Sequence, residues 1–356
     1  MYNKHALADD EEFREGSRRE YTSKLCTALI IKCRVSAETV RRPLSEEFSF
    51  LPFQLFLIYS PHLTLTSLKY FFISYGMLDL SAALTIASKC QHDSNQTRHR
   101  INLVNEWQIQ PGFRVLEIGC GQGECTAVLA TAVGSKGCVD AVDPASLDYG
   151  APVTLGQAQA HISGTDLGDR INWNQISPFD FLMSVDENSP YDVAVLAHSI
   201  WYFPSQDILM DILRALRRKA KRVCIAEYAL STSTLAAVPH VLAALTRAAL
   251  EAYKSVSEEN IQTALAPARI TAIAEEMGWK LLHQAVVVPE EGLLDGTWEA
   301  GTVKTEEFLA EIESAVHDER VKVLLGSMRD AVLNSLAKLS PEATVRTMDT
   351  WVAQFK

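Results

Sequence analysis

Paired cysteines and clustered metal ligands are missing from this chain. Its 7 cysteines are irregularly spaced and form no CxxC pair, which argues against a disulfide framework or a cysteine zinc site and favours a reducing compartment. No HxxxH or HExxH motif occurs either, so we expect no metal in the reaction. The polar, mixed-charge start of the sequence lacks the apolar stretch of a secretory signal peptide. We therefore expect a cytoplasmic protein.

Positive charge is also scarce. The chain has 33 Lys and Arg against 44 Asp and Glu, a net charge of -11, whereas proteins that follow a phosphate backbone are usually basic. We therefore expect no nucleic-acid partner. The one basic cluster, RRKAKR at 217–222, suits the end of a predicted helix, where the helix dipole favours cations.

Residues 1–95 are predicted to form a partly helical N-terminal segment. Within it, residues 48–68 contain no Asp, Glu, Lys or Arg, and about 20 apolar residues can span a bilayer. Prolines and several polar residues interrupt this run, which argues against a membrane span. A gene-level alternative stays open for residues 35–74, because codon choices there can match intron signals. This part would then be a retained intron and not an evolved element.

Residues 115–130, reading VLEIGCGQGECTAVLA, have the pattern of an apolar strand, a glycine-rich turn and a helix. Glycines at 119, 121 and 123 permit a sharp turn and a close approach of a ligand to the backbone. The dinucleotide fingerprint GxGxxG requires a further glycine at position 124, where this chain has Glu124. This difference disfavours the alternative of an NAD-dependent dehydrogenase.

A second motif lies about 20 residues beyond the glycines, where Rossmann-like sheets place an acid that binds a ribose diol. Residues 137–143, GCVDAVD, read as a strand with Asp143 at its tip. The simpler alternative is that Asp143 and Pro144 form an ordinary turn. The joint presence of both motifs at the expected separation favours a cofactor site.

Together these motifs resemble those of the class I S-adenosylmethionine (SAM) dependent methyltransferases, over roughly residues 97–230 and the two last strands. The resemblance implies that the glycine turn holds the methionine end of SAM, that Glu117 positions its amino group, and that Asp143 holds the ribose. It implies that the loop after the third strand packs against the adenine. The other cofactor contacts that it implies are Gly119, Cys120, Gly121, Gly123, Pro144, Ser177 and Phe179.

The order of the remaining elements predicts an α/β fold with a doubly wound, mostly parallel seven-stranded sheet and an antiparallel last strand. The domain would span 96–356, with helical lid insertions at 231–278 and 290–342. The predicted strands after the second are 170–176, 191–197, 223–228, 279–288 and 345–355. The predicted helices are 97–107, 155–162 and 207–219, with helical blocks at 235–277 and 305–339 and a loop at 177–180.

The candidate acceptor site follows the fourth strand, because ligands of open parallel sheets bind beyond the carboxyl ends of the strands. His198 has an ordinary pKa near neutrality and suits a general base; alternatively it packs against the cofactor and bonds to the backbone. Glu227, at the end of the fifth strand, is the rival base or an anchor for a substrate amine. It could also cap a helix near Ser231.

Three aromatic residues, Trp201, Tyr202 and Phe203, are predicted to line an apolar acceptor pocket, or else to pack in the core. His240 would join them if the first insertion is a lid, and is otherwise structural. We therefore expect a small, hydrophobic metabolite of secondary metabolism as the acceptor, methylated at oxygen, nitrogen or carbon. A protein that binds SAM for a non-methylating or regulatory role is the alternative. The oligomeric state stays open.

Overall fold

The computed structural model describes residues 77–257, 259–340 and 342–356. Every described residue belongs to one compact unit of the chain. The predictions for residues 1–76, including the membrane and intron alternatives, lie outside the described residues.

A seven-stranded sheet has the order β3-β2-β1-β4-β5-β7-β6. The first five strands are parallel, whereas β7 lies antiparallel between β5 and β6. The predicted fold class is therefore confirmed. The strands are β1 (Arg114–Ile118), β2 (Cys138–Asp143), β3 (Ile171–Gln175), β4 (Val193–Ala197), β5 (Val223–Tyr228), β6 (Leu281–Val287) and β7 (Thr350–Phe355).

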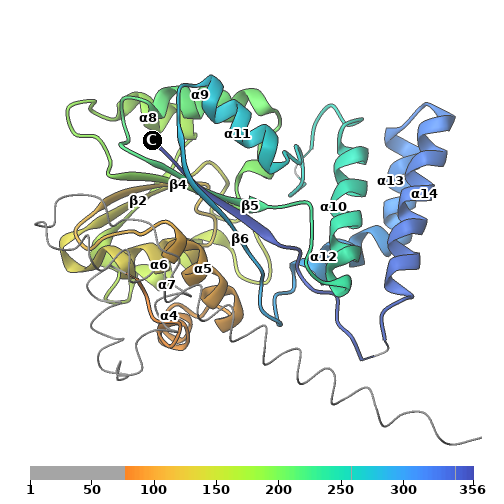
Figure 1. Cartoon of the computed structure of the whole chain (residues 1–356), viewed down its shortest axis with the longest axis horizontal. Coiled ribbons are helices and arrows are strands. Elements are labelled where there is room, and N and C mark those ends of the chain that lie inside the picture. Colours follow the sequence, from red (N-terminus) through yellow and green to blue (C-terminus); the bar gives the residue numbers. More distant parts are fainter. Residues whose placement is uncertain (1–76, 258, 341) are drawn as a thin grey trace, which may run out of the picture. The chain divides into compact units, whose positions relative to one another are not determined.

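Two hydrophobic cores cover the two faces of the sheet, because successive side chains of a strand point to opposite faces. In β1, for example, Val115 belongs to one core and Leu116 to the other. The helices on the first face are α4 (Ala82–Cys90), α5 (Ser94–Glu106), α6 (Glu124–Val133) and α7 (Leu155–Ser163) (Figure 1). Those on the second face are α8 (Pro178–Ser184), α9 (Gln206–Leu216) and α11 (Pro267–Glu276).

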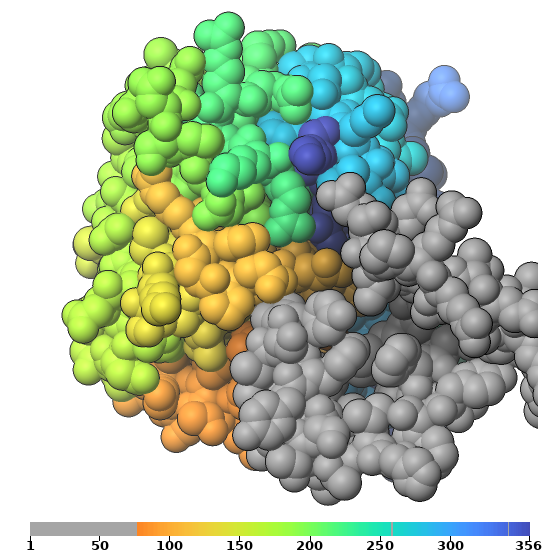
Figure 2. Space-filling model, turned by 60° about the vertical axis from the view of Figure 1, so that its left-hand side comes forward, coloured from red at the N-terminus to blue at the C-terminus, as the bar shows by residue number. Residues whose placement is uncertain are grey.

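Helix α4 packs directly against α5, α6 and α7. Its Lys89 also forms an ion pair with Asp166, at 2.8 Å. In Figure 2, the orange segment that contains this helix and the yellow and green segments of the sheet region form one continuous surface. Residues that the sequence assigns to the N-terminal segment therefore contribute to the packing around the sheet.

Four more helices form a separate group, which we call the helical cap: α10 (Val238–Glu251), α12 (Asp295–Lys304), α13 (Glu306–Ala315) and α14 (Glu319–Leu336) (Figure 1). Helix α10 packs against α12 and α14, and α13 packs against α14. The cap has a hydrophobic core of its own, which includes Val303, Phe308, Leu325 and Val332.

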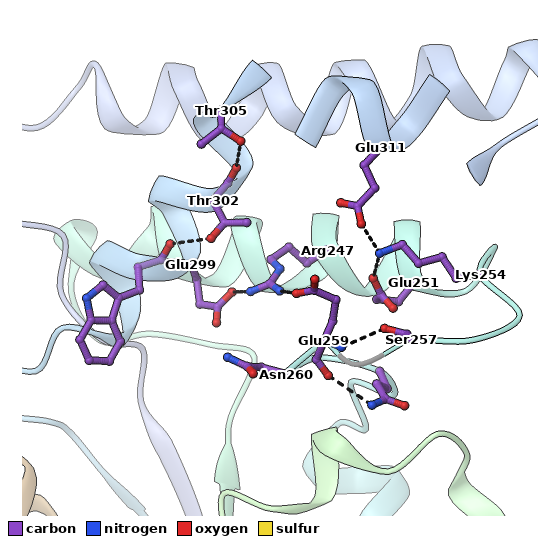
Figure 3. A network of polar contacts seen from close by, with 12 residues as sticks. Arg247, Glu251, Lys254, Ser257, Glu259, Asn260, Glu299, Thr302, Thr305 and Glu311 are labelled. Atoms are coloured by element: carbon purple, nitrogen blue, oxygen red, sulfur yellow. Dashed lines mark hydrogen bonds and ion pairs between the residues drawn. The ribbon is translucent and has the colours of Figure 1, made fainter. Parts of the chain in front are cut away.

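Buried ion pairs hold the cap together (Figure 3). Arg247 of α10 pairs with Glu259 of the following loop and with Glu299 of α12. Lys254 pairs with Glu311 of α13 and with a glutamate at the end of α10. The side chains of Arg247 and Lys254 are only 8% and 13% exposed, so both cations are largely shielded from water, although Glu259 and Glu311 are partly exposed. They connect α10 to two other cap helices and to the loop that leads to α11.

The structure corrects several predicted boundaries. The helical block 235–277 is interrupted, because Pro267 begins α11 and the preceding residue is extended, as proline requires of its neighbour. The second block begins earlier than predicted, at Asp295. The predicted loop 177–180 is the start of α8, whose first residue follows the capping Ser177. The last strand begins at Thr350 and not at 345.

Candidate functional site

The glycine turn between β1 and α6 has the backbone geometry that the sequence predicts. Gly119, Gly121 and Gly123 have φ angles of 77°, 51° and 90°, in the left-handed region that favours glycine. A Cβ at Gly119 would overlap that of Ser199, and a Cβ at Gly123 would lie 2.6 Å from the Trp173 ring. At Gly121 a Cβ would meet no atom within 4 Å. The turn is therefore packed at its two ends and open at Gly121, where a ligand can approach the backbone.

Two predicted acids border this turn. The Asp143 carboxylate accepts hydrogen bonds from the backbone N–H groups of Gly121, at 2.8 Å, and Ala145, at 2.9 Å. The Glu117 carboxyl is buried and accepts a bond from the Thr126 hydroxyl at 2.6 Å. Burial raises the pKa of Glu117 to about 7, against the effect of that hydrogen bond. The residues present thus offer an open glycine cradle with one acid on each side of it.

The other predicted cofactor residues lie in different surroundings. Cys120 and Asp143 line a small cavity together with Asn174 and Gln175, two residues at the end of β3 that the sequence reasoning missed. Ser177 instead caps α8 by accepting a bond from the Asp180 N–H at 3.1 Å. The remaining two predicted residues are exposed, Pro144 at the start of its loop and Phe179 with half of its surface in solvent.

The two candidate bases lie side by side at the carboxyl ends of β4 and β5. The Nδ1 atom of His198 is 3.5 Å from Oε1 of Glu227. Glu227 accepts backbone N–H bonds from Ile200, at 3.2 Å, and Tyr228, at 2.9 Å. The short helix that follows β5 begins at Leu235 and has no side-chain cap, so the alternative that Glu227 caps a helix near Ser231 is wrong. His198 has a φ of 53°, a strained conformation for a residue with a side chain and one that concentrates at functional sites.

Burial changes the pKa values of Glu227 and His198 in opposite directions. It raises the pKa of Glu227 to about 7, against the effect of the backbone hydrogen bonds. Burial, followed by the positive charge of Arg100, lowers the pKa of His198 to about 3. The near-neutral pKa expected for His198 is therefore not found. It is Glu227 whose pKa lies near neutrality, and the imidazole of His198 is uncharged at physiological pH.

Aromatic rings surround His198. The Tyr228 ring lies 4.5 Å from the His198 ring, 5.1 Å from that of His240 and 5.2 Å from that of Trp201, between ring centroids. On the other side, the His99 ring is 5.7 Å from that of His198. We call these five residues the histidine cluster. The structure therefore brings together three residues that the sequence singled out and adds His99 and Tyr228, which it did not.

Four ring nitrogens of the histidine cluster are buried and have no hydrogen-bond partner among the described residues: both of His198, Nδ1 of His99 and Nε2 of His240. The Nδ1 atom of His240 accepts the backbone N–H of Met348 at 3.0 Å, so its Nε2 carries the proton. Burial lowers the pKa of all three histidines. Because buried polar groups are nearly always paired, these uncharged imidazoles indicate a site for a polar group of a ligand.

Two charged residues that the sequence reasoning missed adjoin the histidine cluster. Asp295, the first residue of α12, accepts the Tyr228 hydroxyl at 2.9 Å and the Gln96 amide at 3.2 Å. Although burial opposes it, the charge of Arg100 and the bond from Tyr228 lower the pKa of Asp295, so its carboxylate is ionised. Neither Asp295 nor Arg100 belongs to a local motif, so no sequence signal could have identified them.

The aromatic residues after β4 separate into three environments. Trp201 joins the histidine cluster, and its indole N–H donates to the Leu265 carbonyl at 3.1 Å. The Trp201 carbonyl accepts the N–H of Gln262 at 2.8 Å, which joins this segment to the loop before α11. Tyr202 is 46% exposed. Phe203 packs instead against the core on the α9 face, so the structure does not bring it to the cluster.

Within the described ranges, no group of three or more His, Cys, Asp and Glu side chains is arranged to hold a metal ion. The same part of the chain contains no helix with both the length and the apolar character that crossing a bilayer requires.

Comparisons with known proteins match this chain to methyltransferases. Residues 82–198, which include the glycine turn and Asp143, match the family Protein-L-isoaspartate(D-aspartate) O-methyltransferase (PCMT). Methyltransferase phomM' of Diaporthe leptostromiformis is 28% identical, over 68% of this chain and 73% of the relative. Methyltransferase phomM of the same organism is 27% identical over the same shares.

One solved structure is similar to this chain over nearly all of its own length. The cyclopropane-fatty-acyl-phospholipid synthase-like protein from Lactobacillus casei is 30% identical, with a TM-score of 0.64, over 80% of this chain and 98% of that one. The sheet order with its antiparallel seventh strand, the open glycine turn and these relatives agree on an enzyme that methylates with SAM as cofactor. The chain belongs to the class I SAM-dependent methyltransferases.

Proposed function

We propose that the enzyme methylates a small, hydrophobic molecule at an oxygen, nitrogen or carbon atom, and that this acceptor binds at the histidine cluster. The observation that carries the proposal is the set of four unpaired, buried imidazole nitrogens on His99, His198 and His240. Each of them can donate or accept a hydrogen bond to a polar group of a ligand, while the rings of Trp201 and Tyr228 would supply apolar contact. A mostly apolar surrounding with a few polar atoms is typical of small-molecule sites.

The glycine turn and its two acids form the proposed cofactor side of the site. The backbone around Gly121 is open to the methionine end of SAM, Glu117 would hold its ammonium group, and Asp143 would hold the ribose hydroxyls. Asn174 and Gln175, which share a cavity with Asp143, are proposed to supply contacts on the adenine side. This assignment replaces Ser177, whose hydroxyl caps α8.

The proposed chemistry needs positioning and one proton acceptor. SAM would supply the methyl group from its sulfonium, whose sulfur would keep the electron pair of the broken S–C bond as the acceptor atom gains the methyl group. Uncharged His198 would take the proton of the acceptor at Nε2 and pass its Nδ1 proton to Glu227, 3.5 Å away. A carboxylate with a pKa of about 7 is well matched to proton removal at neutral pH. Correct placement of the two reactants would supply much of the remaining rate.

The experiment that tests the acceptor class is incubation of the purified protein with methyl-labelled SAM and a metabolite extract. We expect the label in a small, organic-soluble product. Label that appears only in protein or nucleic acid from the same extract would contradict the proposed acceptor class. Tight binding of SAM with no transfer to any fraction would instead favour a non-methylating role.

The ribose assignment gives a separate prediction. Asp143→Ala should weaken SAM binding about 10- to 100-fold, because hydrogen bonds to a charged group contribute about 1.5 to 3 kcal/mol. Isothermal titration calorimetry measures this affinity. Asp148→Ala, which alters an exposed acid of the same loop, is the matched control and should leave binding unchanged. An Asp143→Ala protein with native stability and normal affinity would show that Asp143 does not bind the ribose.

A further inference from the structure

Arg100 of α5 is a buried cation with little direct pairing. Its side chain is only 14% exposed, and its ion pair with Glu124 is long, at 3.4 Å. A guanidinium has five N–H donors in a planar fork that suits a carboxylate. Since Glu124 is itself 29% exposed, this single contact satisfies Arg100 only in part.

The position of Arg100 is fixed by its contact with Glu124 and by the packing of α5 on α6. In agreement with this position, its charge partly offsets the effect of burial on the pKa of Glu117 and of Glu227. Its partner Glu124 is the first residue of α6, directly after Gly123. Arg100 therefore lies at the N-terminus of α6, beside the end of the glycine turn.

The methionine end of SAM carries both an ammonium group and a carboxylate. Glu117 suits the ammonium group, but a carboxylate beside that acid requires a positive partner. Arg100 is a largely buried cation next to the glycine turn, through its contact with Glu124. The N-terminus of α6 has no side-chain cap. It adds partial positive charge on the same side.

We propose that Arg100 binds the carboxylate of the methionine end of SAM, in place of its long contact with Glu124. The cofactor would then be held by opposite charges at its two methionine groups, the ammonium by Glu117 and the carboxylate by Arg100. The inference concerns the cofactor alone and does not depend on the acceptor. Because the bound carboxylate would offset the charge of Arg100, it would also weaken the influence of that charge on His198 and Glu227.

The test compares two ligands that differ by one carboxylate, SAM and decarboxylated SAM, by calorimetry on the full chain. The wild-type protein should prefer SAM about 10- to 100-fold. In Arg100→Gln, SAM should bind about 10- to 100-fold more weakly. Decarboxylated SAM should bind to Arg100→Gln as tightly as to the wild-type protein or more tightly, because a cation near this doubly positive ligand has been removed. The preference should therefore disappear.

Arg98→Gln is the matched control, since Arg98 lies on the same helix and pairs with Glu290 at the surface; it should keep the full preference. Arg100→Lys retains the charge without the fork and should keep a reduced preference, which provides a second variant if glutamine prevents folding. Equal weakening of both ligands in Arg100→Gln, or no preference in the wild-type protein, would overturn the proposal. Failure of the proposed acceptor class would appear differently, as normal SAM binding without a methylated small molecule.

Discussion

Glu227→Gln is expected to lower kcat by about 10²- to 10⁴-fold while leaving SAM affinity nearly unchanged. The substitution keeps the shape of the side chain but removes the proton acceptor. Its amide oxygen can accept only one of the two backbone N–H bonds that Glu227 accepts, because the NH2 group is a donor. His198→Ala should lower kcat within the same range, because His198 would pass the proton to Glu227. Since the two groups would act as one unit, the double variant should be little slower than either single variant. Steady-state kinetics with the acceptor found by labelled transfer measure these effects.

The pH dependence of kcat separates the two candidate bases. The Glu227 carboxyl, with a pKa of about 7, is the active base only when deprotonated, so kcat should rise as the pH increases through about 7. Glu227→Gln should abolish this limb. His198, with a pKa of about 3, is uncharged throughout the accessible range and should contribute no limb near neutrality.

Two kinetic outcomes would contradict this assignment. A raised KM with little change in kcat in Glu227→Gln would mean that Glu227 anchors the acceptor in both the ground and the transition state. Near wild-type kcat in both single variants, at saturating acceptor, would mean that catalysis proceeds by positioning alone.

The second large effect is expected on stability. Arg247→Met should lower the free energy of unfolding by about 3 to 5 kcal/mol, because removing one partner of a buried ion pair leaves an uncompensated charge. Most of this loss would come from the carboxylate of Glu299, whose side chain is 14% exposed and which would lose its positive partner. Urea denaturation followed by circular dichroism measures the change in the free energy of unfolding. The loss of stability should lie mainly in the helical cap.

Two further variants control this prediction. Arg218→Met removes an arginine that is 79% exposed and pairs with Glu187, so it should change stability by less than about 1 kcal/mol. Adding Glu299→Gln to Arg247→Met should recover part of the lost stability, since it removes the stranded carboxylate. Equal effects of Arg247→Met and Arg218→Met would show that the network in Figure 3 contributes little.

The parts of the molecule that could be predicted from the sequence depend on local patterns. The glycine turn and Asp143 lie in short segments. In these segments the residue types determine the backbone conformation and the position of the strand ends. The strand order follows from the resemblance that these segments carry. Pro267 is a local signal for the interruption of the first helical block, but the alanine-rich composition around it obscured that signal.

The histidine cluster could not be predicted in the same way. His99, Tyr228 and His240 come from three elements, α5, β5 and α10, and only the tertiary fold brings them together. The pKa of His198 likewise depends on burial by these neighbours and on the charge of Arg100. Phe203, two residues after Trp201, packs against a different hydrophobic core, a distinction that composition alone does not make.

The place of β7 in the sheet has a consequence for synthesis on the ribosome. β5 and β6 emerge before β7, yet each pairs with β7 and not with the other. Until α12, α13, α14 and β7 have also emerged, both strands of the nascent chain present an unpaired edge, which is a site for aggregation. Glu227 pairs in register with Trp351, so its strand is completed only by this late insertion. A nascent chain stalled before β7 should therefore need chaperone protection and should lack a correctly formed acceptor site.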